Sequence, residues 1–222
     1  MEYSETMVPV WGSLYFQDGV SSVMEQVIFF HDHVMMIMVM VMVIVGYVLC
    51  NVGVYNYYSL GLKEGQELES VWTLVPAFFL LAIAFPSMRL LYLMEEEGDS
   101  GLSVKVVGHQ WYWSYEYGGL GFDSYMSKES GLIGRLLDVD NVLNVVAGVG
   151  TRFLITSDDV IHSWALPSTG VKVDAIPGRL NQVLIYFQRV GLLVGQCSEI
   201  CGANHSFMPI VVKVLVWQDM VN

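Results

Sequence analysis

Two long apolar runs in the first half of the chain restrict what it can fold into. Residues 34–55 (VMMIMVMVMVIVGYVLCNVGVY) contain no charged side chain, and a helix that crosses a membrane needs roughly 20 such residues. A second run, residues 71–88, contains two prolines, which membrane helices tolerate with kinks. The sequence therefore predicts a transmembrane hairpin over residues 31–94, with helices at about 31–55 and 70–94 joined by a short polar connection.

The composition agrees with a membrane part and excludes some functions. The chain has 222 residues, of which 54% are hydrophobic, and its net charge is −12. A basic face for nucleic acid is therefore not expected, whereas an acidic surface suits a basic protein partner. Three cysteines, an odd number, argue against a disulfide-stapled framework. Lysine and arginine are too scarce around the hairpin for the positive-inside rule to fix its orientation.

The second half of the chain has the pattern of a β domain. Residues 1–30 are set apart as an N-terminal segment, and the acidic, glycine-containing residues 95–103 are expected to be a linker. Residues 104–222 contain several short segments rich in valine and aromatic residues, separated by glycine, proline, aspartate and asparagine. Short strands without a long helical pattern predict an antiparallel sandwich or barrel.

A cluster of possible metal ligands lies near the C-terminal end, in the stretch GQCSEICGANHSFMP at residues 195–209. Two thiolates, an imidazole and a thioether can meet at one point in so short a loop. Thiolate and thioether are soft ligands that suit Cu(I), and imidazole binds copper in either state. Zinc does not seek methionine, and a disulfide between the two cysteines leaves the histidine and the methionine unexplained. Copper is therefore favoured, with the spacing Cys197-x3-Cys201-x3-His205-x2-Met208.

The number of sulfur ligands indicates which kind of copper site is present. A single-copper electron-transfer site uses two histidines, one cysteine and a weak methionine, so the cluster has one cysteine too many. Two copper ions that share two sulfurs accommodate the second cysteine but need a second histidine. His162 lies upstream, and we expect it on a neighbouring strand or loop. Taken alone it is more often an ordinary buried histidine, but together with the downstream cluster it completes the candidate set.

Longer motifs surround these ligands and carry a resemblance to a known family. GHQWYWSYEY, DVIHSWALPS, VKVDAIPGRLNQ and GQCSEICGANHSFMPI closely resemble cytochrome c oxidase subunit II, and FHDH and ELESVWTLVPA extend the similarity to the hairpin. The resemblance implies a membrane α-hairpin followed by an all-β domain, a cupredoxin-like Greek-key β-sandwich that carries a binuclear CuA centre. It also implies the copper ligands, with Glu199 acting through its backbone carbonyl: His162, Cys197, Glu199, Cys201, His205 and Met208.

The resemblance implies further roles outside copper ligation. The side chain of Glu199 is expected to help hold Mg²⁺ at the contact with subunit I. Trp111 matches the position where electrons from cytochrome c arrive, although an aromatic cluster of this kind is also typical of a sandwich core. Glu69 matches the acidic residue at the mouth of a proton-uptake path into subunit I; by pattern alone it is an acid near a helix end.

An acidic surface for docking basic cytochrome c belongs to the same picture, because complementary charge speeds and orients encounter. After SYEY the chain has only GGLG before FDSY, where many relatives carry a longer acidic loop. In residues 100–222 acids outnumber bases only slightly, so the patch is expected to be weaker or rearranged. The candidate docking acids are Glu116, Asp123, Asp140 and Asp159.

The function implied by the resemblance is one-electron relay. The chain is expected to accept electrons from cytochrome c and pass them to the haem and copper centres of subunit I, which reduces oxygen to water and pumps protons. The expected partners are subunit I, other oxidase subunits, cytochrome c and membrane lipid, but not nucleic acid. The expected location is the mitochondrial inner membrane, crossed twice, with the β domain and the N-terminus facing the intermembrane space.

Three other classes of protein compete with this interpretation. A quinol oxidase subunit II keeps the domain without copper, and the intact cysteines, histidine and methionine argue against it. A membrane-tethered copper-binding or assembly protein would need neither the aromatic run at residues 111–113 nor the acids near the hairpin. A receptor or adhesion sandwich without metal leaves the ligand cluster unexplained.

Overall fold

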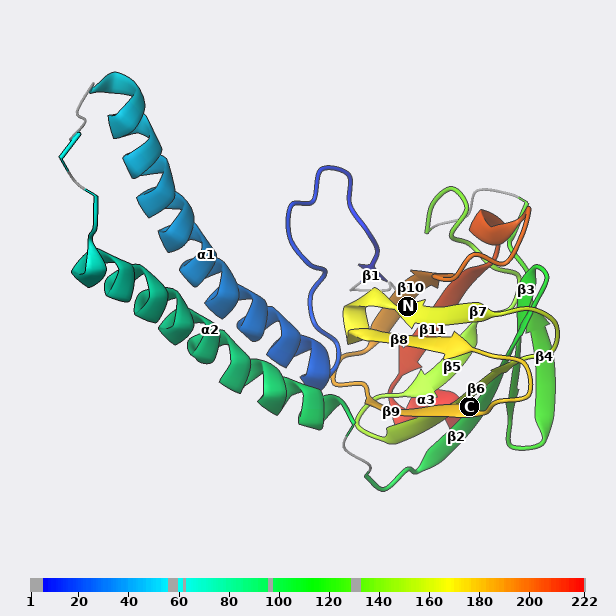
Figure 1. Cartoon of the computed structure of the whole chain (residues 1–222). Coiled ribbons are helices and arrows are strands. Elements are labelled where there is room, and N and C mark those ends of the chain that lie inside the picture. Colours follow the sequence, from blue (N-terminus) through cyan, green and yellow to red (C-terminus); the bar gives the residue numbers. More distant parts are fainter. Residues whose placement is uncertain (1–5, 56–59, 62, 96–97, 129–132, 222) are drawn as a thin grey trace. The chain divides into compact units, whose positions relative to one another are not determined.

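The chain forms two compact units, a β unit and a helical unit (Figure 1). The structure, a computed structural model, describes residues 6–55, 60–61, 63–95, 98–128 and 133–221. The β unit contains Met1–Glu25 and Glu95–Asn222, and the helical unit contains Gln26–Met94. Residues 1–5 of the expected N-terminal segment and residues 96–97 of the expected linker lie outside the described residues.

The two apolar helices expected from the sequence are α1 (Ser22–Val54) and α2 (Gln66–Met94), and the helical unit contains α2 and all of α1 from Gln26 onward. Each is long and apolar enough to cross a membrane. α1 begins at Ser22, earlier than the expected start near residue 31. The reason is a local cap: the Ser21 hydroxyl accepts a hydrogen bond from the backbone N–H of Met24 at 3.0 Å, so the helix starts ahead of the apolar run.

α2 begins with acidic side chains and tolerates two internal prolines. Glu67 and Glu69 lie in its first turn, where a negative charge is favoured by the partial positive charge of the helix N-terminus. Pro76 and Pro86 lie inside the helix, as is common for membrane helices. The two helices contact each other through His33, whose Nε2 donates to the carbonyl oxygen of Ala82 at 3.2 Å.

The β unit contains two larger sheets that form a sandwich and a small third sheet that carries the predicted ligand His162. One sheet has the strand order β4-β3-β2-β6-β9, the other β1-β10-β11-β5, and β7 pairs with β8. Most neighbours are antiparallel, but β6 runs parallel to β2, β5 runs parallel to β11 and β1 runs parallel to β10. The strand bounds are β1 Thr6–Met7, β2 Leu102–His109, β3 Tyr112–Tyr117, β4 Leu120–Ser124, β5 Leu143–Val146, β6 Gly150–Ser157, β7 His162–Leu166, β8 Val171–Ala175, β9 Asn181–Tyr186, β10 Gly191–Gln196 and β11 Pro209–Leu215. Three short helical turns complete the unit, η1 Pro167–Thr169, η2 His205–Phe207 and α3 Trp217–Val221.

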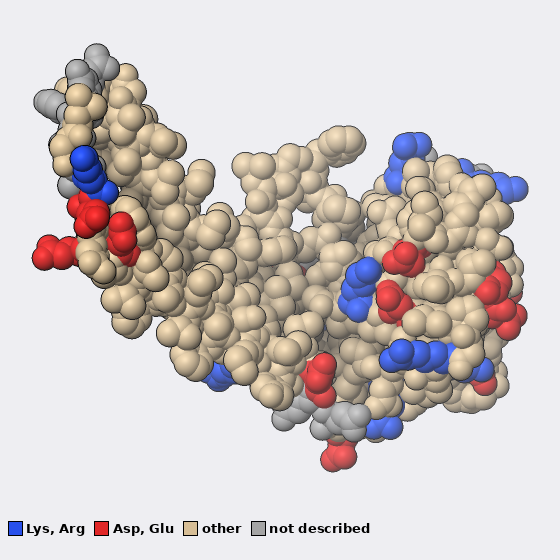
Figure 2. Space-filling view, in the orientation of Figure 1, with Lys and Arg blue, Asp and Glu red and all other residues tan. Residues whose placement is uncertain are grey.

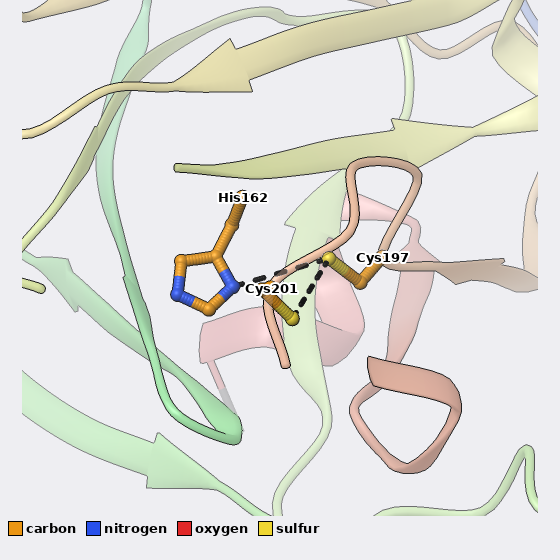
Figure 3. A group of neighbouring side chains, drawn as sticks. All are labelled: His162, Cys197 and Cys201. Carbon is orange, nitrogen blue, oxygen red and sulfur yellow. Dashed lines mark hydrogen bonds between the residues drawn. The ribbon is translucent and has the colours of Figure 1, made fainter. Parts of the chain in front are cut away.

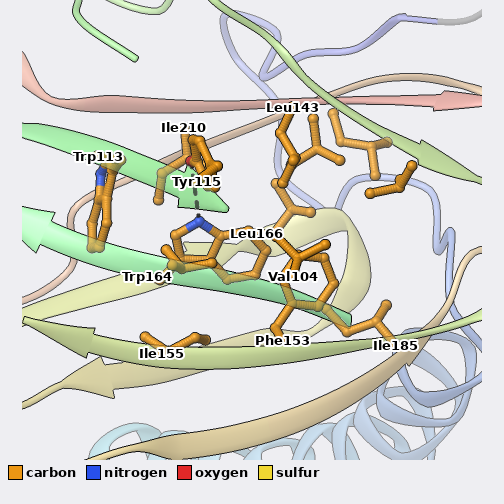
Figure 4. Packing of buried hydrophobic residues seen from close by; sticks show 14 of the residues in the cluster. Val104, Trp113, Tyr115, Leu143, Phe153, Ile155, Trp164, Leu166, Ile185 and Ile210 are labelled. Carbon is orange, nitrogen blue, oxygen red and sulfur yellow. Dashed lines mark hydrogen bonds between the residues drawn. The ribbon is translucent and has the colours of Figure 1, made fainter. Parts of the chain in front are cut away.

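Large aromatic side chains fill the core between the sheets (Figure 4). Burial alternates along β6, as it does when a strand turns every second side chain inward. Trp164 and Phe153 stack with ring centroids 4.9 Å apart, and the indole N–H of Trp164 donates to the Tyr115 hydroxyl at 3.4 Å. Trp113, fully buried, donates from its indole N–H to the carbonyl oxygen of Met208 at 3.3 Å. The core therefore extends to the edge of the ligand loop.

Candidate metal centre

The ligand loop joins two neighbouring strands, which brings its two ends together. β10 and β11 are antiparallel, and Gln196 pairs with Pro209. Cys197 follows Gln196 and Met208 precedes Pro209, so these two residues begin and end the loop next to each other. On the other side, the backbone N–H of Ser198 donates to the carbonyl oxygen of Ser163 at 3.0 Å. This bond holds the loop against the start of β7, where His162 is the first residue.

The side chains of His162, Cys197 and Cys201 point toward one another (Figure 3). Their ligand atoms all lie within 4.8 Å of one another. Cys197 Sγ is 3.9 Å from His162 Nδ1 and also 3.9 Å from Cys201 Sγ. Because a disulfide bond is about 2.05 Å long, the two cysteines are free thiols here.

Three more predicted ligands complete the group around the two thiols. Cys201 Sγ lies 3.6 Å from Nδ1 of His205 and 3.5 Å from Sδ of Met208. The carbonyl oxygen of Glu199 lies 3.3 Å from Cys197 Sγ. The structure thus brings together all of the copper ligands that the resemblance implied.

The predicted ligand side chains are largely buried, and most of their ligand atoms are sulfur, which soft metals prefer. His162 and Met208 are at most 1% exposed, and the two cysteines are at most 6% exposed, whereas His205 is half-buried. Ionised thiols are costly to bury unless they pair with a positive charge or bind a metal. Two thiols, two imidazoles and a thioether match the preferences of copper better than those of zinc, which does not seek a thioether. The residues present therefore fit a copper pair.

The two thiols differ in acidity. Burial alone would raise the pKa of Cys197, but its hydrogen bonds with His162 and with the backbone of Ser163 and Glu199 lower that pKa to about 6. Burial and the neighbouring negative charge of Cys197 raise the pKa of Cys201 to about 12. Without metal, the pair therefore holds one thiolate and one thiol at neutral pH, and a metal must displace the remaining proton.

Asp159 orients the first histidine. Its Oδ1 lies 2.8 Å from His162 Nε2, so the opposite nitrogen, Nδ1, faces Cys197. Burial opposes the charged imidazole, but hydrogen bonds with Cys197 and Asp159 outweigh it and raise the pKa of His162. Burial likewise opposes the charge of Asp159, and the hydrogen bonds from His162 and two backbone N–H groups outweigh it and lower that pKa. A carboxylate behind a ligating histidine fixes the tautomer and ring orientation of that histidine.

Gln110 connects Asp159, the partner of His162, with the loop that carries Cys201. This residue was not identified from the sequence. Its backbone N–H donates to Asp159 Oδ2 at 2.6 Å, while its side-chain Nε2 donates to the carbonyl oxygen of Cys201 at 2.8 Å. The only available signal was its position inside the motif GHQWYWSYEY, next to the predicted Trp111. The Trp111 indole N–H also donates to the Cys201 carbonyl, at 3.3 Å.

A surface pocket of about 450 Å³ opens beside Trp111. Trp111 is half-buried, so one side of its ring lines the pocket while its N–H reaches the ligand loop. Asn204 and Phe207, which flank His205 in the same loop, form another part of the wall. The full lining is Gln110, Trp111, Tyr112, Tyr125, Met126, Asn204 and Phe207.

The predicted docking acids make contacts within the chain. Glu116 lies 3.4 Å from Lys105, and Asp123 accepts a hydrogen bond from the Ser114 hydroxyl at 2.7 Å. Asp140 accepts the backbone N–H of Tyr125 at 2.8 Å. On the face drawn in Figure 2, acidic and basic side chains are interspersed over the β unit.

Glu69 belongs to the helical unit, whereas the predicted copper ligands belong to the β unit. It lies in the first turn of α2, in the helical unit, and is exposed. Its backbone carbonyl accepts a hydrogen bond from the Thr73 hydroxyl at 2.8 Å. Trp111 contacts the ligand loop within the β unit, and the predicted role of Glu69 stays a prediction.

Two models of known protein families match this chain. A family model described as cytochrome C oxidase subunit II, periplasmic domain, matches residues 102–215, and the model of the corresponding transmembrane domain matches residues 9–90. The chain belongs to the cytochrome c oxidase subunit II family. The resemblance drawn from the motifs is thereby confirmed.

Individual relatives agree over nearly the whole length. Cytochrome c oxidase subunit 2 of Yponomeuta malinellus and that of Drosophila melanogaster are each 52% identical over 209 residues, which are 91% of this chain and 92% of each relative. A crystal structure of the periplasmic domain of subunit II of cytochrome oxidase (CoxB) from Bradyrhizobium japonicum is 43% identical, with a TM-score of 0.53. It covers 56% of this chain and 91% of the solved one. The expected fold class, a two-helix membrane hairpin followed by a cupredoxin-like sandwich, is confirmed.

Proposed function

We propose that this chain is the electron-accepting subunit of a haem-copper terminal oxidase. It takes electrons from cytochrome c at a binuclear CuA centre and passes them to the haem and copper centres of subunit I, where oxygen is reduced to water and protons are pumped. The observation that carries the proposal is the buried convergence of His162, Cys197 and Cys201, within 4.8 Å of one another, in a chain of this family. The chain is thus one subunit of an enzyme whose oxygen site lies in a partner.

The same geometry supports the proposed ligand set. A bound copper pair supplies one-electron redox chemistry to the site. Asp159 holds the His162 ring in place, and Gln110 holds both Asp159 and the Cys201 loop. A ligand cage that is fixed before the electron arrives needs little rearrangement, and burial keeps water out of it. The proposed ligands are His162, Cys197, the Glu199 carbonyl, Cys201, His205 and Met208.

Trp111 is the proposed point where electrons from cytochrome c reach the site. Its half-buried ring faces the surface pocket, and its N–H bonds to the carbonyl of Cys201. The exposed acids Glu116, Asp123 and Asp140 are retained as proposed contributors to docking. Asp159 is retained as well and has a second proposed role, because its carboxylate faces His162 and the backbone of Gln110.

Three further roles are proposed from the family resemblance. Glu199, whose side chain is half-buried at the ligand loop, helps to hold Mg²⁺ against subunit I. Glu69, exposed at the start of α2, lies at the mouth of a proton-uptake path into that subunit. The two apolar helices anchor the chain in the mitochondrial inner membrane, in contact with lipid and with the other oxidase subunits. The β unit and the N-terminus face the intermembrane space.

Electron uptake from cytochrome c tests this function. The full chain in detergent is loaded with copper and mixed with reduced cytochrome c in a stopped-flow instrument, and oxidation of the cytochrome is followed. We expect rapid one-electron transfer that Trp111→Phe slows while copper content stays unchanged, because Gln110 still holds the Cys201 carbonyl. The matched control is Trp217→Phe in α3, whose ring is 64% exposed. A chain that binds copper but takes no electrons would instead be a copper-binding or assembly protein.

A further inference from the structure

A buried glycine lies directly against the first histidine of the metal site. Gly108 is in β2, where it pairs with Trp113 of β3 and with Ser157 of β6. A Cβ atom added to Gly108 would lie 2.9 Å from Cδ2, 3.0 Å from Cγ and 3.1 Å from Cβ of His162. Real Cβ atoms essentially never approach another atom as closely as the first of these distances, and the other two are tighter than nine in ten real contacts. The histidine therefore occupies the space that any other residue at position 108 would fill.

The histidine has no room to move away from a larger residue. The atoms that would be struck are those nearest its own backbone, and that backbone is paired with Ala175 of β8. The far end of the ring is held by Asp159 at 2.8 Å, and Trp113 packs edge-on against it with centroids 5.8 Å apart. His162 is 0% exposed. A methyl group on residue 108 would therefore tilt the ring or push β7 away from β2.

The backbone gives no separate reason for glycine at this position. Nine glycines of the described chain have a positive φ, and Gly108 is not among them. Other residues can adopt its extended conformation, and glycine inside a strand weakens that strand. A glycine in such a place often marks the close approach of another group. Here that group is the imidazole ring.

We propose that Gly108 is a positioning residue for the copper centre: by lacking a side chain, it sets how closely the His162 ring lies to β2 and hence where Nδ1 stands relative to Cys197. The ring is confined between β2 on one side and Asp159 and Trp113 on the others. The 3.9 Å separation of His162 Nδ1 and Cys197 Sγ depends on that confinement. The copper role of Gly108 rests on the proposed function, whereas its steric contact with His162 does not.

Gly108→Ala in the full, copper-loaded chain tests the copper role. The matched control is Gly121→Ala in β4 of the same sheet, where an added Cβ meets nothing closer than a carbonyl oxygen at 3.9 Å. We expect Gly108→Ala to change the copper hyperfine pattern in electron paramagnetic resonance and to weaken copper retention against a chelator about tenfold or more. Gly121→Ala should leave both unchanged. An unaltered spectrum and unaltered retention in the folded Gly108→Ala variant would overturn the proposal.

A double-mutant cycle on the metal-free chain tests the contact itself. His162→Gly removes every atom that the new methyl group would strike. We expect Gly108→Ala to lower the melting temperature of the unaltered chain, and to lower it far less or not at all when His162→Gly is also present. If Gly108→Ala alone fails to fold, the double variant should recover folding. An equal loss in both backgrounds, or a double variant that still does not fold, would overturn the proposal. Absence of a copper signal from the unaltered chain would instead count against the proposed function.

Discussion

Asp159 and His162 form a carboxylate–imidazole pair, with Oδ1 2.8 Å from Nε2, and this pair aims the other ring nitrogen at the cysteines. The pair connects the surface of the β unit with the buried site, because Asp159 is partly exposed while His162 is fully buried. The same carboxylate accepts the backbone N–H of Gln110. Asp159, which was proposed from the sequence as a docking acid, therefore also contacts a predicted copper ligand.

Asp159→Asn should weaken copper binding while leaving the fold intact. The amide keeps the size of the side chain but loses the charge that fixes the His162 tautomer, and loss of such a partner lowers metal affinity by about 10- to 100-fold. Competition with a chelator at fixed pH measures the change. The matched control is Asp158→Asn, which removes the same charge from the neighbouring, 79% exposed residue. Equal affinities for the two variants would show that Asp159 does not act through His162.

The two cysteines of the metal-free chain should react with iodoacetamide at different pH. The Cys197 pKa is about 6 and the Cys201 pKa about 12, and the thiolate is the reactive form. Labelling of Cys197 should therefore rise as the pH passes about 6, while labelling of Cys201 should need a much higher pH. Peptide mass mapping separates both from Cys50.

Cys197→Ser provides the control for this titration. The negative charge of Cys197 is one cause of the raised Cys201 pKa, so its removal should lower the pH at which Cys201 reacts. Burial remains, so the Cys201 pKa should stay above its ordinary value. Identical pH profiles for the two cysteines in the unaltered chain would contradict the asymmetry described here.

Gly195→Ala should destabilise the β unit strongly. An added Cβ would overlap the carbonyl oxygen of Ala165, so β10 could no longer approach β7. Overpacking against backbone is expected to cost about 3 kcal/mol or more, which corresponds to a fall in melting temperature of roughly 10 °C. Near-ultraviolet circular dichroism during heating measures it, with Gly121→Ala as the control. A melting temperature within a degree or two of the unaltered chain would rule out this close approach.

Neutralising the docking acids should slow the encounter with cytochrome c only at low salt. Glu116→Gln with Asp123→Asn removes two exposed negative charges from β3 and β4, and we expect an association rate about threefold lower at low ionic strength. The difference in association rate should vanish at about 1 M salt, where the Debye screening length is about 3 Å. Asp219→Asn in α3, which follows the other sheet, should have a smaller effect. A decrease that persists at high salt would argue against electrostatic docking by these acids.

Local patterns predicted the parts of the molecule that depend on nearby residues. The uncharged run at residues 34–55 indicated a spanning helix because lipid demands continuous apolar length. The spacing from Cys197 to Met208 indicated a metal loop because its ligands lie within one short connection. The start of α1 was missed, because the cap at Ser21 depends on a single hydrogen bond outside the apolar run.

Contacts between distant segments could not be read from the sequence in the same way. The register of β2 beside β6 places Gly108 opposite Ser157, near the turn that carries Asp159, and no local period encodes that pairing. Gln110 reaches Cys201 across 91 positions of sequence. Asp159 was assigned by charge alone, although its place three residues before His162 was a usable hint. These residues hold the ligands, and only the tertiary structure brings them together.

Electron paramagnetic resonance of the copper-loaded full chain, combined with a copper count, tests the central claim most directly. The account predicts two copper ions per chain and one unpaired electron shared equally between them, which gives a seven-line hyperfine pattern. One copper with a four-line pattern, or zinc bound without a signal, would contradict it, because the paired thiols of Cys197 and Cys201 would then not be holding two copper ions.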